Sequence, residues 1–146
     1  KAEYSERAED WEENAMRLKR KFETATKLVP DPSIDVVKGS SLCIVAFGTT
    51  RYAIEEARYV LKRKGFLTDF VRLKSLPVND TSRSVFREHD KVIVIELNNE
   101  GQLCGILRNE FPEIANRLIS VAHLDGMPLT PEWVERELGK YLEGWS

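Results

Sequence analysis

Four apolar, β-forming residues stand in a row at positions 92–95, and they run without a break into a polar, glycine-containing segment. An apolar run that does not alternate with polar residues is typical of a strand buried on both faces, as in a parallel sheet covered by helices. Loops at the carboxyl ends of such strands carry the binding surface of the fold. Four polar residues of the segment are therefore candidate functional residues: Glu96, Asn98, Asn99 and Gln102.

A structural interpretation of the same segment stays open. Asparagine and glycine are the residues that turns and helix amino ends prefer, so Asn98, Asn99 and Gly101 are also suited to make the turn and cap the next helix.

The rest of the chain alternates between strand and helix patterns. The strand candidates are residues 34–37, 42–47, 66–73, 91–97 and 118–123. Helical patterns lie between them, and a final helix opens at Thr130-Pro131-Glu132, with Gly144 as its expected end. This order predicts an α/β fold, a three-layer α/β/α sandwich with a largely parallel sheet.

Residues 4–29 have a different pattern. Apolar residues recur there at alternating spacings of four and three, from Tyr4 and Ala8 to Ala25 and Val29. This spacing predicts a long amphipathic helix with a narrow apolar seam. The proline after Val29 ends it. The large residues of the seam, which need a covering surface, are Trp11, Leu18 and Phe22.

Composition excludes several classes of protein. A chain of 146 residues that is 42% hydrophobic and 32% charged fits one globular domain after the helix. The net charge of −2 and the lack of a basic tract argue against nucleic-acid and membrane-surface binding. No apolar run reaches the ~18 residues of a membrane span, and no secretory leader is visible, so we expect a cytoplasmic protein. Because the chain begins with Lys1 and not with Met, we expect either a domain cut out of a longer polypeptide or a chain whose first residues were removed.

The sequence lacks the common catalytic and cofactor-binding motifs. Gly48-Thr49-Thr50, after the strand at 42–47, lacks the further glycines of a dinucleotide fingerprint, although a phosphate-cradling role for it stays open. Two cysteines cannot supply an iron–sulfur cluster, and we expect both to be buried hydrophobes. Glu96 and Asp125 follow two different strands, but no spacing brings them together as an acid–base pair. We expect no metal centre and no catalytic residue in this chain.

The segment 96–103, Glu-Leu-Asn-Asn-Glu-Gly-Gln-Leu, resembles the Glu-x-Asn-x-x-Gly-Gln-Leu segment of 2-oxoacid:ferredoxin oxidoreductase alpha subunits. It lies there in the carboxyl-terminal, transketolase-C-like domain. Other landmarks occur in the same order, and the resemblance covers about residues 33–142. One departure is the loop at Leu76-Pro77-Val78-Asn79, where the family usually places an aromatic residue before the first proline and a second proline soon after. The landmarks are Gly39, Gly48-Thr49-Thr50, Ala53, Ala57, Gly65, Pro77 and the segment from Asp125 to Pro131.

The resemblance implies five strands, with residues 34–37 as an antiparallel edge strand and the others parallel. It implies a whole enzyme that decarboxylates a 2-oxoacid with coenzyme A and reduces ferredoxin. Thiamine diphosphate, Mg and iron–sulfur clusters would be held by its other domains and subunits. In this reading residues 30–146 are an assembly domain without catalytic or cofactor-binding residues, and residues 1–29 are a helix or linker from the preceding domain.

Two alternatives accompany this reading. If the chain is instead an independent α/β module, it would hold a small anion or a nucleotide at Gly48-Thr49-Thr50 and at residues 98–102. If the preceding domain is missing, the isolated chain would form a homodimer, in which a second copy covers the apolar seam of the helix.

Overall fold

The computed structural model describes residues 4–40 and 42–142. A five-stranded sheet forms its centre, with the order β1-β3-β2-β4-β5. Its strands are β1 (Ser33–Asp35), β2 (Leu42–Phe47), β3 (Thr68–Leu73), β4 (Lys91–Glu96) and β5 (Leu118–Ala122). β1 pairs with β3 in the antiparallel direction, and the pairs β2–β3, β2–β4 and β4–β5 are parallel. The predicted mostly parallel sheet with one antiparallel edge strand is thus confirmed.

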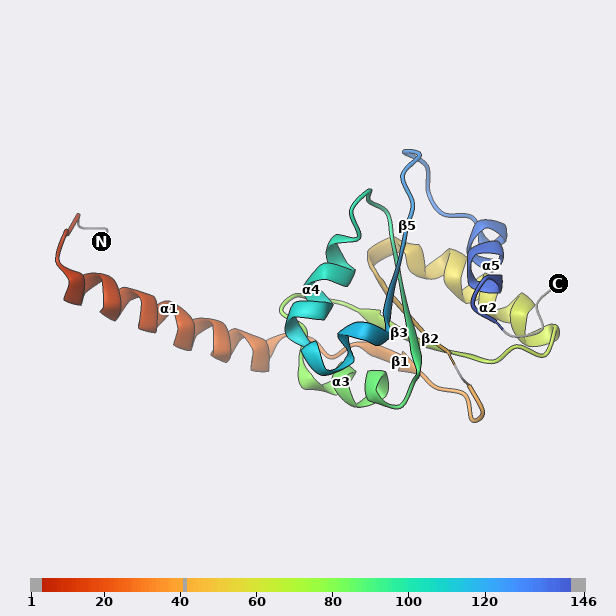
Figure 1. Cartoon of the computed structure of the whole chain (residues 1–146), viewed down its shortest axis with the longest axis horizontal. Helices are drawn as coiled ribbons and strands as arrows, with labels where there is room; N and C mark the ends of the chain where they lie inside the picture. The colour runs from red at the N-terminus through yellow and green to blue at the C-terminus, as the bar shows by residue number, and fades with distance from the viewer. Residues whose placement is uncertain (1–3, 41, 143–146) are drawn as a thin grey trace.

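Helices cover both faces of the sheet, as Figure 1 shows. α2 (Arg51–Arg63) and α5 (Pro131–Gly139) cover one face, and α3 (Asp80–Arg87) and α4 (Gln102–Glu110) cover the other. Short 3-10 turns, η1 (Gly48–Thr50) and η2 (Pro112–Arg117), precede α2 and follow α4. The predicted α/β/α sandwich is therefore confirmed. α5 ends at Gly139, earlier than the predicted end at Gly144, which itself lies outside the described residues.

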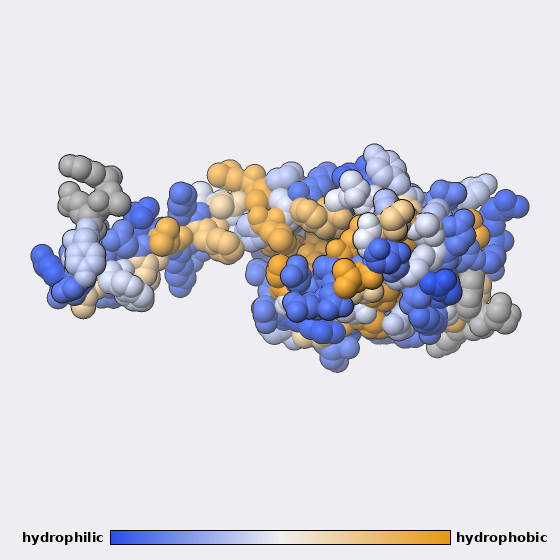
Figure 2. All heavy atoms as spheres, turned by 90° about the horizontal axis from the view of Figure 1, so that it is seen from above, coloured by the Kyte–Doolittle hydropathy of each residue, from blue (hydrophilic) through white to orange (hydrophobic). Residues whose placement is uncertain are grey.

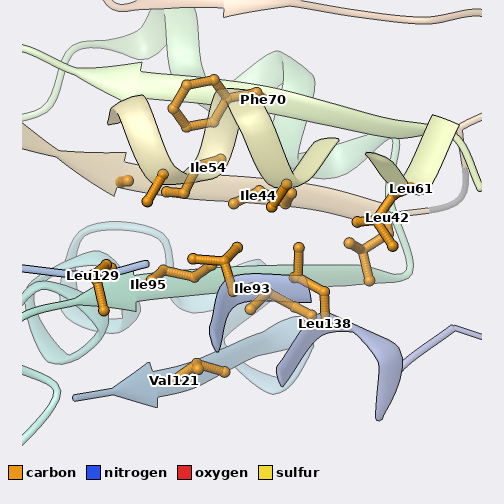
Figure 3. Close-up of a cluster of buried hydrophobic side chains, with 14 residues drawn as sticks. Leu42, Ile44, Ile54, Leu61, Phe70, Ile93, Ile95, Val121, Leu129 and Leu138 are labelled. Carbon is orange, nitrogen blue, oxygen red and sulfur yellow. The ribbon is translucent and has the colours of Figure 1, made fainter. Parts of the chain in front are cut away.

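Two apolar clusters hold the layers together because successive side chains of a strand point to opposite faces. Ile44 and Ile93 pack under α2 and α5 in the cluster that Figure 3 shows. Val45 and Val94, one residue further along each strand, pack under α3 and α4. These four side chains and Val71 are fully buried, as the strand patterns predict.

α1 (Ala8–Leu28) stands apart from the sandwich and projects from it in Figure 1. None of its residues is buried. The helix is shorter than the predicted 4–29, since Tyr4 precedes its first turn and Val29 is its carboxyl cap. The predicted long amino-terminal helix is confirmed, and its seam is uncovered: Trp11 is 75% exposed.

Candidate functional site

The loops after β2 and β4 meet at the point where the strand order reverses. From β2 the chain continues to β3 on one side, and from β4 it continues to β5 on the other side. This is the position at which open α/β sheets place a binding crevice. An open hollow of about 370 Å³ lies there, lined by η1, the loop after β4 and the first turns of α4. The structure therefore brings most of the predicted residues to one place, namely Gly48, Thr49, Thr50, Glu96, Asn98 and Gln102.

Glu96, the last residue of β4, is turned away from solvent and caps α4. One carboxylate oxygen, Oε2, accepts hydrogen bonds from the amide of Leu103 at 2.7 Å and from Nδ2 of Asn98 at 2.6 Å. The other, Oε1, accepts one from the amide of Cys104 at 3.1 Å. The first amides of a helix lack intrahelical partners and carry the positive end of its dipole, so a carboxylate satisfies them well. Glu96 is 6% exposed and acts here as a structural anion.

Asn98 completes the cap with its side-chain carbonyl. Oδ1 accepts hydrogen bonds from the amides of Gly101 at 2.7 Å, Glu100 at 3.2 Å and Gln102 at 3.4 Å. Together, Asn98 and Glu96 accept hydrogen bonds from all five backbone amides of residues 100–104. The turn-and-cap interpretation of this segment therefore describes what Glu96 and Asn98 do.

Gly101 occupies a position that only glycine fits. Its φ is +65°, in the left-handed region where side chains other than glycine are strained. A Cβ placed on it would lie 2.3 Å from Oγ of Ser120 on β5. The glycine of the segment thus allows α4 to begin directly against the neighbouring strand.

This arrangement does not suit a bound phosphate or diphosphate at α4. An anion at a helix amino end needs free amides, and the amides of Leu103 and Cys104 already bind the Glu96 carboxylate. On the β2 side, Thr50 is buried and its hydroxyl donates to the carbonyl of Phe47 at 2.9 Å. Thr49, Asn99 and Gln102 are the predicted loop residues that are exposed.

The rim of the crevice is apolar. Four large hydrophobic side chains line it and are between two fifths and one half exposed: Phe47 at 44%, Leu76 at 46%, Leu97 at 42% and Ile106 at 42%. They come from four different segments, so no pattern along the chain groups them. Pro77 follows Leu76 and is half-buried, but it does not line the hollow. Clustered exposed apolar side chains rimmed by polar residues mark interaction surfaces.

The sequence did not predict two contacts of histidine with aspartate. Nε2 of His89 lies 3.0 Å from Oδ2 of Asp69, and both side chains are buried. Nε2 of His123 lies 3.0 Å from Oδ2 of Asp125 in the loop after β5. The amide of Met127, which donates to Asp125, and the nearby His123 hold the pKa of the Asp125 carboxyl below its ordinary value. Asp125 and Glu96 thus each have their own partners.

None of the helices in residues 4–40 and 42–142 combines the length and the apolar character that crossing a membrane requires. The same residues contain no group of three or more histidine, cysteine, aspartate or glutamate side chains placed to hold a metal ion.

The α/β/α fold of this chain is similar to parts of two solved structures. A 2-oxoglutarate:ferredoxin oxidoreductase from Magnetococcus marinus matches with a TM-score of 0.78 and 22% identity, over 93% of this chain and 24% of that chain. A split-gene transketolase, an inactive beta4 tetramer, matches with a TM-score of 0.59 and 22% identity, over 78% of this chain and 42% of that one. The resemblance inferred from the sequence is thus confirmed at the level of the fold.

This chain spans about a quarter of the length of the oxidoreductase and less than half of the transketolase. Neither a protein-family model nor a curated protein matches its sequence.

Proposed function

We propose that this chain is the carboxyl-terminal domain of the alpha subunit of a 2-oxoacid:ferredoxin oxidoreductase, and that its role is assembly. The fold match to such an enzyme over 93% of the chain carries the proposal, and the ordered landmarks from Gly39 to Pro131 support it. The whole cytoplasmic enzyme would decarboxylate a 2-oxoacid with coenzyme A, form the acyl-CoA and reduce ferredoxin. Its thiamine diphosphate, Mg and iron–sulfur clusters would belong to other domains and subunits.

The crevice supports a docking role for this domain. Glu96 and Asn98 are committed to backbone amides, and the residues lining the hollow include no cysteine, serine, histidine or lysine. Phe47, Leu97 and Ile106 present apolar surface around these fixed loops. A rigid, partly apolar rim at the carboxyl ends of the strands suits a neighbouring domain that covers it. Thr49, Asn99 and Gln102 would supply hydrogen bonds at its edge.

The proposal is tested in the full-length subunit, expressed with its partner subunits. We expect Leu97→Glu, on the rim, to reduce co-purification of the complex at least tenfold, while the fraction that still assembles keeps its turnover number. Tyr59→Glu on α2 is the matched control, because Tyr59 is also exposed, at 63%, but does not line the crevice. It should leave assembly unchanged. A fully assembled Leu97→Glu complex with turnover lowered ~100-fold, about 2.7 kcal/mol of transition-state stabilisation, would assign the rim to catalysis instead.

Asn98→Ala is a less direct test than it appears from the sequence. Removing its carbonyl leaves the amides of Gly101 and Gln102 without their acceptor, so the variant would lose stability as well as any contact with a partner. Leu97, one residue before it, is exposed, and its side chain can be changed without disturbing the cap.

We also propose that the isolated chain is inactive and binds no thiamine diphosphate. Calorimetry with thiamine diphosphate and Mg should give no heat of binding, and a micromolar dissociation constant would contradict the proposal. An independent anion- or nucleotide-binding module is the less favoured function, because at α4 its ligand would compete with Glu96 for the same amides.

The isolated chain, we propose further, forms a homodimer through α1. The uncovered seam supports it, since fully burying side chains such as Trp11, Leu18 and Phe22 is worth roughly 1.5 to 3 kcal/mol each. Light scattering of the chain should give the mass of a dimer.

A further inference from the structure

We propose that two copies of this chain pair through α1 in the antiparallel direction, with Glu12 of each copy beside Lys19 of the other. The inference rests on the proposed self-association and adds its direction and register. It concerns a surface separate from the crevice, so the two proposals stand or fall in different experiments.

The apolar seam of α1 is open along its whole length. Trp11, Leu18 and Phe22 are 75%, 55% and 59% exposed, and the groove beside Leu18, Phe22 and Ala25 has no cover. α1 leaves the sandwich at its carboxyl end and extends away from it, and Figure 2 shows apolar surface along the helix. Folding back onto its own domain would require a different path at Val29-Pro30.

The spacing of the seam is the same in both chain directions. Within the helix, the seam residues lie at positions 8, 11, 15, 18, 22 and 25. Turning a second copy end for end about a twofold axis between residues 16 and 17 therefore places a seam residue opposite every seam residue. Ala8 then faces Ala25, Trp11 faces Phe22, and Ala15 faces Leu18 of the other copy. Each pairing occurs twice, which is the geometry of antiparallel coiled-coil layers.

The charges of α1 distinguish the antiparallel from the parallel direction. The amino-terminal half carries Glu9, Asp10, Glu12 and Glu13, and the half that follows carries Arg17, Lys19, Arg20, Lys21 and Lys27 with a single acid, Glu23. A parallel pair would set the acidic half beside the acidic half and the basic half beside the basic half of the other copy, although Arg7, before the helix, would then lie near Glu12. An antiparallel pair sets each acidic half against a basic half and also opposes the two helix dipoles.

Glu12 and Lys19 flank the seam on the same side, because they are one heptad apart and each follows a seam residue. In the antiparallel register they lie within reach of one another across the interface, twice by symmetry. In a parallel pair the residue near Glu12 would be Arg7 of the other copy, and Lys19 would lie near Asn14. The charges at 12 and 19 therefore report on the direction of pairing.

The antiparallel direction also separates the two globular domains. A helix of 21 residues is about 30 Å long, and each domain continues from its carboxyl end. Antiparallel pairing therefore places the two domains at opposite ends of the helix pair.

Sedimentation equilibrium of the isolated chain tests the pairing itself. The wild type should be a dimer, and Trp11→Glu with Phe22→Glu should be a folded monomer with an unchanged far-UV spectrum of the sandwich. Met16→Glu is the matched control, because Met16 is an exposed apolar residue of α1, at 46%, that lies off the seam. It should leave the dimer intact. A wild-type monomer at millimolar concentration, or a mass that Trp11→Glu with Phe22→Glu does not change, would overturn the proposal.

Charge reversal tests the direction. Glu12→Lys gives a chain with bases at both positions, and Lys19→Glu gives one with acids at both. Each alone should dimerise about tenfold more weakly than the wild type, since two attractive pairs become repulsive. An equimolar mixture should recover wild-type affinity as a heterodimer, and so should the double variant. A dimer that neither the mixture nor the double variant restores would overturn the antiparallel register, even where self-association and the role of the crevice both hold.

Discussion

The Glu96 carboxylate lies 2.7 Å from the backbone amide of Leu103, in the first turn of α4, and is buried there. A strand and the helix that follows it are thus joined by an intramolecular anion at the position where related folds bind an external one. The arrangement makes the loop rigid. Glu96 and Asn98 hold the backbone, while residues beside them in the loop remain exposed.

Glu96→Ala should lower the free energy of unfolding by about 2 to 5 kcal/mol. The substitution leaves the buried amides of Leu103 and Cys104 without an acceptor, and each such loss costs about 1–3 kcal/mol. Urea denaturation of the isolated domain measures this change in the free energy of unfolding. Glu96→Gln keeps one oxygen acceptor and should lose less, and Glu100→Ala, an exposed acid of the same loop, should stay within about 0.5 kcal/mol of the wild type. Equal stability of Glu96→Ala and Glu100→Ala would contradict the capping role.

Gly101→Ala should be strongly destabilising, by at least about 2 kcal/mol, because a left-handed backbone costs a non-glycine residue about 1–2 kcal/mol before any clash. The added Cβ would also meet Oγ of Ser120. Gly105→Ala is the control on the same helix: nothing lies within 4 Å of its Cβ, so it should stabilise α4 by about 0.5–1 kcal/mol. Thermal unfolding of the two variants should therefore shift in opposite directions.

The sequence predicts the layers and the parallel sheet well, because these depend on local periodicity, whereas α1 begins later and α5 ends earlier than predicted. β2 has its predicted bounds, and the other strands differ by a few residues at their ends. It also identifies the loop from Glu96 to Gln102, but it leaves open whether those polar groups point inward or outward. That choice depends on the position of α4 against β5, which the contact of Gly101 with Ser120 fixes and which no pattern along the chain encodes.

The contacts that the sequence missed join residues far apart in the chain. Asp69 is an acid inside an otherwise buried strand, a signal that indicates a buried partner, but its partners Val37 and His89 are about 32 and 20 residues away. The apolar rim of the crevice was missed for the same reason, since its residues come from four segments: Phe47 from β2, Leu76 from the loop after β3, Leu97 from the loop after β4 and Ile106 from α4.

Asp69→Ala should therefore cost about 2–5 kcal/mol of stability, because it leaves the amide of Val37 and Nε2 of the buried His89 without their acceptor, at about 1–3 kcal/mol each. Nδ1 of His89 lies 2.8 Å from the carbonyl of Val85 while Nε2 lies 3.0 Å from Asp69, so both ring nitrogens face acceptors. The aspartate also accepts from the amide of Val37 at 2.8 Å, which ties the segment after β1 to β3. Asp35→Ala, an exposed acid on β1, is the control and should cost about 1 kcal/mol or less. Urea denaturation that gives both variants the same midpoint would show that the buried pair contributes nothing.

The two cysteine thiols should be inert in the folded domain. Burial raises the pKa of Cys43 far above its ordinary value of 9.0, and the nearby Asp69 charge adds to the effect. Burial also raises the pKa of Cys104. Because only the thiolate reacts, a disulfide reagent at pH 8 should titrate no thiol in the native domain and both after unfolding in urea.

The same pKa shifts give a dependence of stability on pH. A thiol whose pKa is raised by folding stays protonated in the native state and ionises in the unfolded one. Its contribution is therefore complete below the unfolded value of 9.0 and is lost as the pH rises above it. The free energy of unfolding should fall between pH 9 and pH 11 more steeply in the wild type than in a Cys43→Ala, Cys104→Ala double variant. Identical slopes for the two proteins would show that ionisation of the thiols does not cause the loss of stability at alkaline pH.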